Sequence, residues 1–181
     1  LRPDGERSEP DETVPRDSET PGEIIISSPA KSAFCYFNNE EMTEKKFYKG
    51  WLYTGDIGRI DEEGFLIICD RKKDLIITGG FNVFPSELEA AAITAENVAD
   101  AIAIGVPNER RGEVPAIFVQ PIAGRTVDLN EVERVCREKL SRFKVPKEYY
   151  VMDMLPKTKN RKPDRKMVKK LYLEHAFDDQ K

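Results

Sequence analysis

Four consecutive charged residues, Arg71-Lys72-Lys73-Asp74, lie between two short apolar runs and limit how this chain can fold. The first run is Phe65–Cys69 and the second is Leu75–Ile77. A run of four charges is hard to bury, so we expect it at the surface between two separately packed units. The turn dipeptides Gly55-Asp56 and Glu63-Gly64 precede it, and they predict a compact β-hairpin.

Length and charge narrow the classes of function. The chain has 181 residues, of which 39% are hydrophobic, so it suits one or two small domains with a real core. Its 29 Lys and Arg against 33 Asp and Glu give a net charge of -4, which offers no general attraction to nucleic acid or to an anionic membrane. Its apolar runs fall far short of the roughly 20 residues of a membrane span, and no signal-peptide pattern follows Leu1. We therefore expect a cytoplasmic protein with no nucleic-acid partner and no transmembrane segment.

The cysteine and histidine contents exclude several kinds of site. Cys35, Cys69 and Cys136 are odd in number and widely separated, which argues against a disulfide framework and a zinc site. We expect reduced, mostly buried thiols. His175 is the only histidine, so most Ser-His-Asp hydrolases, Cys-His proteases and His-ligated metal sites are excluded. We expect no metal ligands in this chain.

The first part of the chain changes from polar to strand-forming sequence. Residues 1–20 are rich in Pro, Ser and charged residues, and we expect a mobile polar segment. Because it begins at Leu1 without an initiator methionine, the chain also suggests a piece cut from a longer protein. Ile24–Ile26 predict a short strand buried on both faces. Glu40–Phe47 predicts a short helix that Gly50 ends.

After the charged run, the pattern is that of an α+β unit. Pro85 and Ser86 precede an acidic turn and good helix formers, which predicts a helix. Asp128 and Glu131 have the spacing of a capping box at the start of a second helix. The remaining predicted elements are strands at Val98–Val106, Val114–Gln120 and Glu148–Met152, the first two paired, and a terminal helix at Lys166–Phe177.

Three features have a chemical interpretation, and each also has a simpler one. Asp56 follows a glycine, and its carboxylate could accept both hydroxyls of a ribose, or it could cap a turn. Arg71 offers donors to ribose or phosphate, or it is a solvated surface residue. The loop Leu155–Lys166 holds six Lys or Arg in twelve residues, so a lysine there could reach an anionic reacting group. A basic surface tail or a nucleic-acid patch fits that loop equally well.

Taken together, these residues resemble the C-terminal signature of the adenylate-forming enzymes, which include acyl-CoA synthetases, luciferases and peptide-synthetase adenylation domains. WLYTGD resembles their ribose-binding YxTGD, and LPKTKNRKPDR resembles their LPKTxxGKIxR loop. The stretch GFLIICDRKKDLIITGGFNVFPSELE resembles their hinge and the hairpin after it, in the form found in acyl-CoA ligases. The resemblance covers about Pro21 to Leu173.

The resemblance implies roles for individual residues. Asp56 would hold the ribose hydroxyls of ATP with help from Arg71, and Lys162 would be the mobile catalytic lysine. Lys73 falls at the hinge position of the family. The residues Gly79, Gly80 and Phe81 would line the pantetheine tunnel of coenzyme A, where missing side chains let the backbone approach a narrow ligand.

The resemblance also implies a domain organisation. Residues 21–70 would be the β-rich tail of a large N-terminal domain, residues 71–74 the hinge, and residues 75–181 a mobile C-terminal α+β domain with a β-hairpin, a three-stranded sheet and helices. The family's glycine before the lysine is Arg161 here, and Pro163 replaces an apolar residue, so both could stiffen the lysine loop. The phosphate loop and acyl pocket of the family are missing, so we expect the chain alone to be inactive.

These implications give a leading hypothesis and two alternatives. The leading one is the C-terminal fragment of an ATP-dependent carboxylic acid:CoA ligase, closest to fatty acyl-CoA synthetases, which would use ATP, Mg²⁺ and coenzyme A. Its partners would be the large N-terminal domain of the same polypeptide and a carboxylic acid. The alternatives are an adenylation enzyme that loads a carrier protein, and a noncatalytic interaction module with the same fold.

Overall fold

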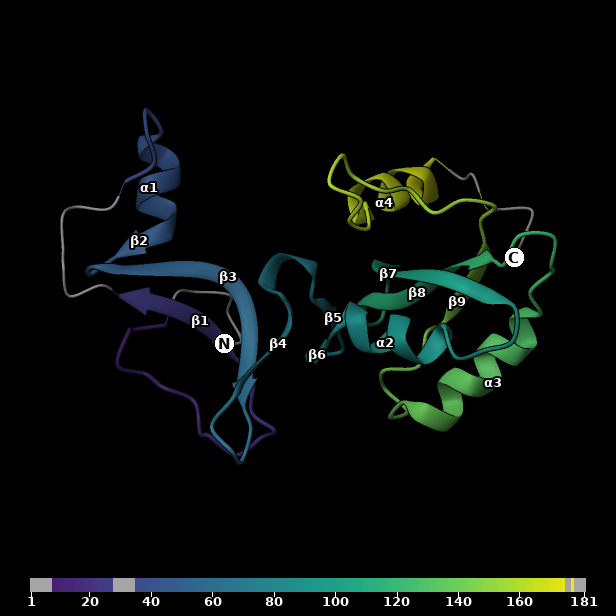
Figure 1. Cartoon of the computed structure of the whole chain (residues 1–181), viewed down its shortest axis with the longest axis horizontal. Coiled ribbons are helices and arrows are strands. Elements are labelled where there is room, and N and C mark those ends of the chain that lie inside the picture. The colour runs from purple at the N-terminus through teal and green to yellow at the C-terminus, as the bar shows by residue number, and fades with distance from the viewer. Residues whose placement is uncertain (1–7, 28–34, 175–176, 178–181) are drawn as a thin grey trace. The chain divides into compact units, whose positions relative to one another are not determined.

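The computed structural model describes residues 8–27, 35–174 and 177, and it forms two compact units, Leu1–Lys73 and Asp74–Lys181 (Figure 1). A short 3-10 helix, η1 (Lys72–Asp74), lies at the boundary. The boundary therefore falls inside the charged run that separates the two apolar stretches of the sequence.

The first unit is built on a four-stranded antiparallel sheet in which β3 pairs with each of the other strands. Helix α1 precedes β2 in the chain. The elements are β1 (Gly22–Ser27), α1 (Glu40–Lys46), β2 (Phe47–Tyr48), β3 (Trp51–Ile60) and β4 (Leu66–Arg71).

The predicted hairpin is confirmed as β3 and β4. The carboxylate of Asp61 accepts hydrogen bonds from the backbone N–H groups of Glu63, at 3.1 Å, and Phe65, at 2.8 Å, and thereby holds the turn. Gly64 has a φ of +90°, a conformation that side-chain-bearing residues rarely adopt. The turn is therefore specified by the same residues that predicted it.

Two predictions for this unit need correction. The strand β1 is confirmed, but it is not buried on both faces, since 54% of Ile26 is exposed. Helix α1 is confirmed and begins after Asn39, whose side chain accepts from the N–H of Met42 at 2.9 Å. It ends at Lys46 because the chain becomes extended at the next residue. Gly50 instead forms the turn between β2 and β3, with a φ of +79°.

Residues 8–20, the described part of the predicted mobile segment, have no helix or strand but pack along the first sheet. The hydroxyl of Tyr53 donates to the carbonyl of Ser8 at 2.6 Å. The N–H of Ser18 donates to the carbonyl of Ile60 at 3.1 Å. The segment is thus tied to both ends of β3, and residues 1–7 lie outside the described residues.

The second unit is α+β, which confirms the predicted fold class. Its sheet has the order β6-β5-β8-β7, with β9 beside β8, and only the β8–β9 pair is parallel. The predicted hairpin and three-stranded sheet are joined into one five-stranded sheet, because Thr78 pairs with Gly112. The elements are β5 (Ile76–Thr78), β6 (Phe81–Val83), α2 (Pro85–Ala92), β7 (Val98–Asn108), β8 (Gly112–Pro121), α3 (Leu129–Lys139), β9 (Glu148–Val151) and α4 (Arg165–Leu173).

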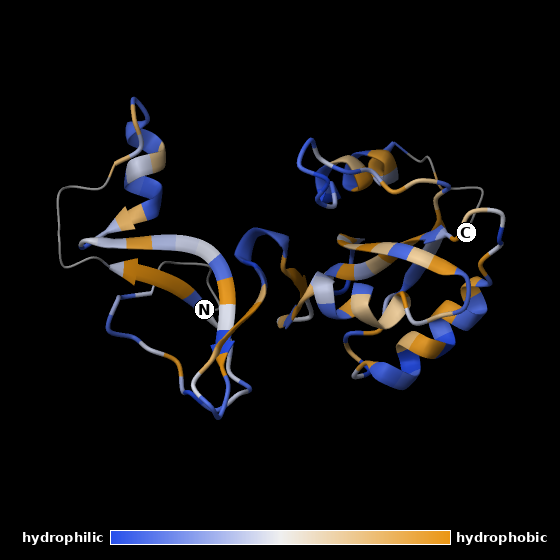
Figure 2. Ribbon diagram, viewed as in Figure 1, coloured by the Kyte–Doolittle hydropathy of each residue, from blue (hydrophilic) through white to orange (hydrophobic). Residues whose placement is uncertain are grey.

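Successive residues of β7 and β8 enter two separate cores, one on each face of the sheet. Ala103 and Ile117 belong to the core that α2 and α3 cover. Ile104 and Phe118 belong to the core that contains Val168 of α4. Figure 1 shows α4 on one side of the strands and α2 with α3 on the other, and Figure 2 shows hydrophobic colour along β7 and β8.

Only half of the capping box predicted at the start of α3 is observed. The side chain of Asp128 caps α3 by accepting from the N–H of Asn130 at 2.9 Å. Glu131, the other half of the predicted capping box, instead binds Arg134 at 2.7 Å. The predicted terminal helix, Lys166–Phe177, is observed as α4, which ends at Leu173. Residues 175–176 of the predicted range lie outside the described residues.

Within the described residues, no helix is long and apolar enough to cross a membrane.

The three cysteines are free, as predicted, but they are not mostly buried. Cys136 is buried in the core beneath α3, whereas Cys35 is exposed and Cys69 is intermediate. His175 lies outside the described residues.

Candidate functional site

The pairing of β3 with β4 brings Asp56 and Arg71 together, although they are far apart in the sequence. They are direct cross-strand partners, and Nε of Arg71 lies 3.0 Å from Oδ1 of Asp56. Their side chains are 32% and 58% exposed, so the pair is open to a ligand. A carboxylate acceptor thus lies beside a guanidinium that has further donors, an arrangement suited to a ligand with neighbouring hydroxyl groups.

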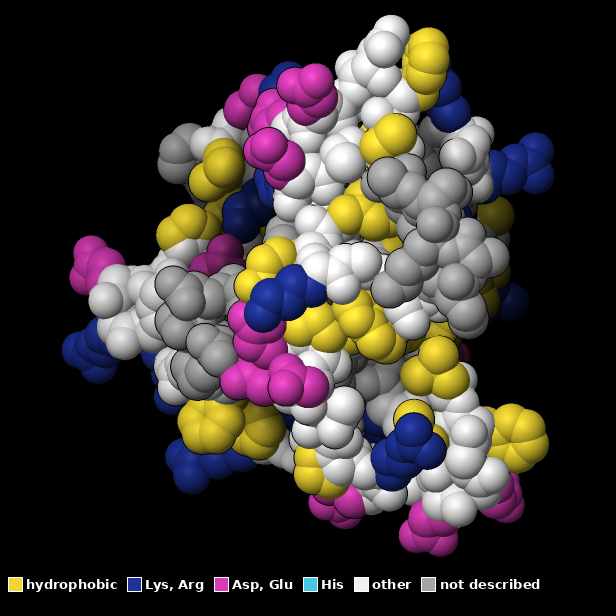
Figure 3. Space-filling model, turned by 90° about the vertical axis from the view of Figure 1, so that its left-hand side faces the viewer, with side chains coloured by type: hydrophobic (Ala, Val, Ile, Leu, Met, Phe, Trp, Pro, Cys, Tyr) yellow, Lys and Arg dark blue, Asp and Glu magenta, His cyan; other side chains and the backbone are white. Residues whose placement is uncertain are grey.

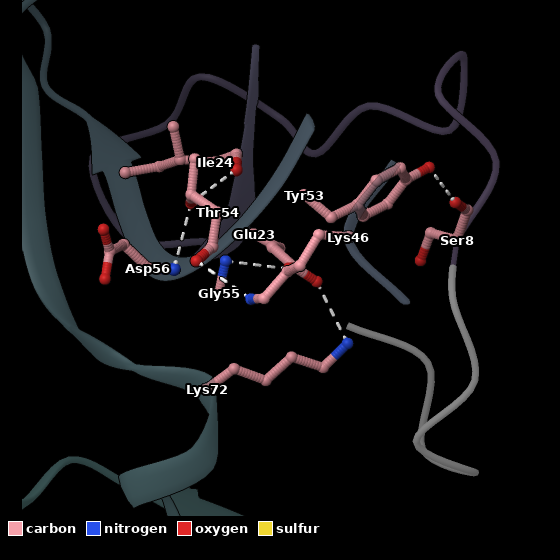
Figure 4. Close-up of polar contacts among 9 residues, drawn as sticks. All are labelled: Ser8, Glu23, Ile24, Lys46, Tyr53, Thr54, Gly55, Asp56 and Lys72. Carbon is pink, nitrogen blue, oxygen red and sulfur yellow. Dashed lines mark hydrogen bonds and ion pairs between the residues drawn. The ribbon is translucent and has the colours of Figure 1, made fainter. Parts of the chain in front are cut away.

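Polar contacts from β1 fix the backbone around Asp56 (Figure 4). The hydroxyl of Thr54 donates to the carbonyl of Ile24 at 2.7 Å and accepts from the N–H of Asp56 at 3.0 Å. The carboxylate of Glu23 accepts from the N–H of Gly55 at 3.1 Å. Gly55 has a φ of +79°, which explains why a glycine precedes the aspartate.

A hollow of about 550 Å³ lies beside this strand within the first unit. Nζ of Lys72 is 3.0 Å from Glu23, and Nζ of Lys46 donates to the carbonyl of Thr54 at 3.2 Å (Figure 4). The lysine and arginine side chains that line the hollow outnumber its one carboxylate, that of Glu23, so the hollow favours an anionic ligand. The lining residues are Glu23, Lys45, Lys46, Tyr53, Thr54, Gly55, Arg71, Lys72 and Lys73.

No sequence motif points to Glu23 or Lys46. Glu23 is 32 positions from its partner Gly55, and no local pattern connects the two residues. Lys46 appears in the sequence only as one of several charges on a short helix. Only the folded structure shows that both side chains reach the backbone of Thr54 and Gly55.

Lys73 lies in η1, at the last position before the boundary between the two units. It also lines the hollow of the first unit. Its role as a hinge stays a prediction.

Gly79 and Gly80 form the tight turn between β5 and β6. Their φ angles are +56° and +84°, as a two-residue hairpin turn requires. Apart from the glycine itself and its two chain neighbours, no heavy atom of the described residues lies within 4 Å of the position where a Cβ would stand on either glycine. Close approach of a ligand is the reason that the motif implies for the glycines, and the positive φ angles add a conformational reason.

Phe81 follows this turn and is 56% exposed. Its ring lies against that of Phe143, with 4.9 Å between the centroids. The hairpin therefore presents an open backbone turn beside an aromatic surface, which suits a narrow ligand with apolar parts.

Lys162 lies on an exposed loop that is closed at its base by pairing of Lys157 with Pro163. The N–H of Thr158 donates to the carbonyl of Lys162 at 2.8 Å, and the N–H of Lys162 donates back to the hydroxyl of Thr158 at 3.3 Å. Its ammonium has no hydrogen-bond or ion-pair partner among the described residues. The loop is thus ordered while its lysine remains available.

Arg161 shows how the loop accommodates its departures from the family pattern. Its φ is +58°, the left-handed conformation that a glycine would adopt easily. Its N–H donates to the carbonyl of Thr158 at 2.8 Å, so the turn forms despite the arginine. Pro163 fits the pairing at the loop base without a backbone donor, because the two hydrogen bonds of this bridge run from the N–H of Thr158 to Lys162 and from the N–H of Asp164 to Pro156.

The candidate residues are divided between the two units. Asp56, Arg71 and Lys73 belong to the first, whereas Gly79, Gly80, Phe81 and Lys162 belong to the second. In the part of the chain that the structure describes, no group of three or more His, Cys, Asp or Glu side chains could hold a metal ion.

Comparison with known proteins adds independent findings. Residues 87–162 match the family described as the AMP-binding enzyme C-terminal domain. The 2-succinylbenzoate–CoA ligase of Geobacillus sp. (strain WCH70) is 40% identical over 171 residues, which cover 94% of this chain and 34% of that protein. The chain therefore spans about a third of the length of this relative.

Two solved structures have the same fold. The o-succinylbenzoate CoA synthetase of Bacillus subtilis, in complex with its acyl-adenylate intermediate, is 37% identical with a TM-score of 0.75, over 84% of this chain and 31% of that chain. A fatty acyl CoA synthetase of Mycobacterium tuberculosis is 34% identical with a TM-score of 0.61, over 86% of this chain and 30% of that chain. These findings confirm the resemblance seen in the motifs, and the chain belongs to the adenylate-forming enzymes, of which it carries the AMP-binding C-terminal domain.

Proposed function

We propose that this chain is the C-terminal part of an ATP-dependent carboxylic acid:CoA ligase. The observation that carries the proposal is the contact between Asp56 and Arg71, which the fold makes from two separate motifs and leaves open to solvent. Family membership supports it, since the matched ligase and synthetase are named for thioester formation with CoA.

The proposed reaction has two steps. An oxygen of the substrate carboxylate attacks the α-phosphorus of ATP, and the bond to pyrophosphate breaks to give an acyl-adenylate. The sulfur of coenzyme A then attacks the acyl carbon, loses its proton, and AMP leaves. The Bacillus subtilis synthetase was solved with an acyl-adenylate bound, which is the product of the first step.

Asp56 and Arg71 would bind the ribose of ATP. A carboxylate accepts hydrogen bonds from two adjacent hydroxyls, and the contact at Nε uses one of the five N–H donors of Arg71. The anion-favouring hollow beside β3 lies next to this pair and includes Arg71 in its lining. No residue of this chain is assigned to the Mg²⁺ that accompanies ATP, because the described residues hold no suitable cluster.

Lys162 would stabilise the charge that develops when the carboxylate attacks. Its exposed ammonium stands on a hydrogen-bonded loop, so it is positioned before the substrate arrives. A positioned donor of this kind contributes on the order of 3–4 kcal/mol to a transition state. Since Lys162 and Asp56 belong to different units, the first step requires the two units to meet.

The second step would use the glycine turn. Gly79, Gly80 and Phe81 would line the path of the pantetheine arm, because the turn carries no side chain and the adjoining ring is exposed. Exchanging Lys162 for this turn between the two steps requires a pivot, and Lys73 at the unit boundary is our candidate.

The type of acid that is activated and the acceptor of the acyl group are two further parts of the proposal. A fatty acid, our sequence-based preference, appears in the name of the Mycobacterium tuberculosis protein, whereas the names of the Geobacillus and Bacillus subtilis proteins favour a succinylbenzoate-type aromatic acid. The Geobacillus and Bacillus subtilis proteins are 40% and 37% identical to this chain, against 34% for the Mycobacterium tuberculosis protein, and this difference favours an aromatic acid. A carrier-protein acceptor remains the alternative, and comparing CoA with a carrier protein in the second step separates the two.

The first unit supports the idea of a larger N-terminal partner in the same polypeptide. Among its described residues, only Tyr53 and Ile57 are buried hydrophobic side chains. Phe65–Ile68 of the hairpin are all exposed, as are Ile26 and Phe37, and Figure 3 shows hydrophobic side chains open to solvent on the face that it draws. Apolar surface of this extent is normally covered by another part of a protein. The noncatalytic alternative would use the same surface, but it would leave Lys162 without a role.

The test measures ATP/pyrophosphate exchange in the longer polypeptide that contains this chain. We expect Lys162→Ala to lower exchange by about 10²–10³-fold, the usual effect of removing one positioned donor. Lys159→Ala is the matched control, because it removes a lysine of the same loop that we assign no role. Equal exchange by Lys162→Ala and the unaltered protein would refute the catalytic assignment.

A further inference from the structure

The lysine loop is attached to the rest of the second unit by an ion pair that has no assigned role. Nη2 of Arg165, at the start of α4, lies 2.7 Å and 2.8 Å from the two carboxylate oxygens of Glu89 in α2. The side chains are only 20% and 15% exposed. Arg165 follows Lys162 by three positions, so the pair lies directly beside the base of the loop.

Glu89 is itself fixed by the sheet. Its carboxylate also accepts from the backbone N–H of Ala103 at 2.8 Å. Ala103 belongs to β7, which is an edge strand of the sheet. Its N–H is directed to Glu89 and not to the neighbouring strand β8. One carboxylate therefore joins α2, the edge of β7 and the start of α4, and α2 and α4 lie on opposite faces of the sheet (Figure 1).

Burial separates this pair from the other ion pairs near the loop. Lys157 contacts Asp100 at 2.9 Å, but these side chains are 47% and 37% exposed, and an exposed pair contributes little. Lys169 contacts Glu113 at 3.0 Å, again with exposed side chains. Of these three pairs, only Glu89–Arg165 is both shielded from solvent and bonded to the backbone of a strand.

A shielded ion pair is weak evidence for stability, because desolvation offsets much of its attraction. Here one donor, Nε of Arg165, is buried without a partner among the described residues, so the arrangement is not optimised for stability. The better-attested effect of such a pair is to select one geometry among several. The geometry it selects here is the position of α4 and of the loop that leads into it.

We infer that Glu89 and Arg165 are positioning residues that hold the Lys162 loop against the edge of β7. This inference deepens the proposed function and rests on it where catalysis is concerned. Neither residue would touch substrate; they would act by keeping the ammonium of Lys162 within reach of the reacting oxygens, where a misplacement of about 1 Å can cost about 10²-fold in rate.

The first test uses this chain alone and needs no activity. Limited digestion with trypsin, followed by mass spectrometry, measures cleavage after Lys159 and Arg161 in the loop and after Arg111 in the β7–β8 turn. Glu89→Gln retains every trypsin site and an oxygen for the N–H of Ala103, but it removes the charge. We expect cleavage in the loop to rise about tenfold, the usual range for losing a charge-assisted hydrogen bond, with cleavage after Arg111 unchanged.

Glu113→Gln is the matched control, because it neutralises the exposed partner of α4 in the same way. Its loop cleavage should equal that of the unaltered chain. The inference is overturned if Glu89→Gln leaves loop cleavage unchanged, or if it raises cleavage equally after Arg111, which would show general destabilisation.

The second test measures ATP/pyrophosphate exchange in the longer polypeptide. Glu89→Gln should lower kcat at least about tenfold with little change in KM for ATP, because the ribose site is in the other unit. If Lys162→Ala abolishes exchange but Glu89→Gln does not lower it, the positioning role is wrong and the proposed function stands. If loop cleavage rises but Lys162→Ala exchanges normally, the anchoring is correct and the catalytic role of Lys162 is wrong.

Discussion

The left-handed conformation of Arg161 leads to a quantitative prediction about the stability of the second unit. Arg161 is exposed, has a φ of +58°, and stands where the family pattern has glycine. A residue with a Cβ loses about 1–2 kcal/mol in this conformation. Glycine avoids that strain but gains more freedom on unfolding, which costs about 0.5–1 kcal/mol. The difference predicts that Arg161→Gly stabilises the unit by about 0.5–1 kcal/mol.

Lys159→Gly provides the control that isolates the strain. Lys159 lies in the same loop, is exposed, and does not have a positive φ. Its replacement should therefore destabilise the unit by about 0.5–1 kcal/mol, the entropic term alone. Because that term is common to both variants, the gap between them should equal the strain at Arg161, about 1–2 kcal/mol.

Hydrogen exchange of the most protected amides in β7 and β8 measures these differences, because such amides exchange only through global unfolding of their unit. Arg161→Gly should slow their exchange and Lys159→Gly should speed it. If both variants speed exchange by the same factor, the left-handed conformation carries no strain and the reasoning is refuted.

Four further outcomes follow from the described residues. Gly80→Ala should destabilise the second unit by about 0.5–1 kcal/mol in urea unfolding, because the strain of about 1–2 kcal/mol that alanine suffers at a φ of +84° exceeds the gain of about 0.5–1 kcal/mol from removing a glycine from the unfolded chain; an unchanged midpoint would contradict this. Burial raises the pKa of the Cys136 thiol to about 11, so iodoacetamide should modify exposed Cys35 quickly and Cys136 only after unfolding. Since that folded pKa exceeds the unfolded value of about 9, the contribution of Cys136 to stability should be complete below pH 9 and should be lost as pH rises toward about 11, which urea unfolding across this range tests. In this isolated chain, amides of β3 should exchange faster than those of β8, because so few side chains of the first unit are buried; equal protection would show that its sheet is stable uncovered.

Local signals in the sequence predicted most of the elements. Turn residues predicted the β3–β4 hairpin, and alternating apolar residues predicted β7 and β8, because both signals act over a few positions. The errors also have local causes. The sequence predicts that Gly50 ends a helix, but a glycine with positive φ fits a turn between strands equally well.

The candidate site was predictable only through family motifs. Composition and spacing left Asp56, Arg71 and the lysine loop each with a simpler interpretation, and the resemblance chose between them. Glu23 and Glu89 have no such motif, and their partners lie 32 and 76 positions away. Contacts of this kind depend on how strands and helices are packed, which no window of sequence contains.

The two units differ in how far they can account for their own stability. The second has a core on each face of its sheet, with aromatic side chains such as Phe118 and Tyr150 stacked 5.0 Å apart. The first has a well-bonded sheet whose hydrophobic side chains are mostly only partly buried or exposed, although the segment of residues 8–20 packs along it. Hydrogen bonds alone contribute little net stability to such a sheet. The first unit is therefore better understood as part of a larger folded body, and the boundary after Lys73 as the point where one cooperative unit ends and another begins.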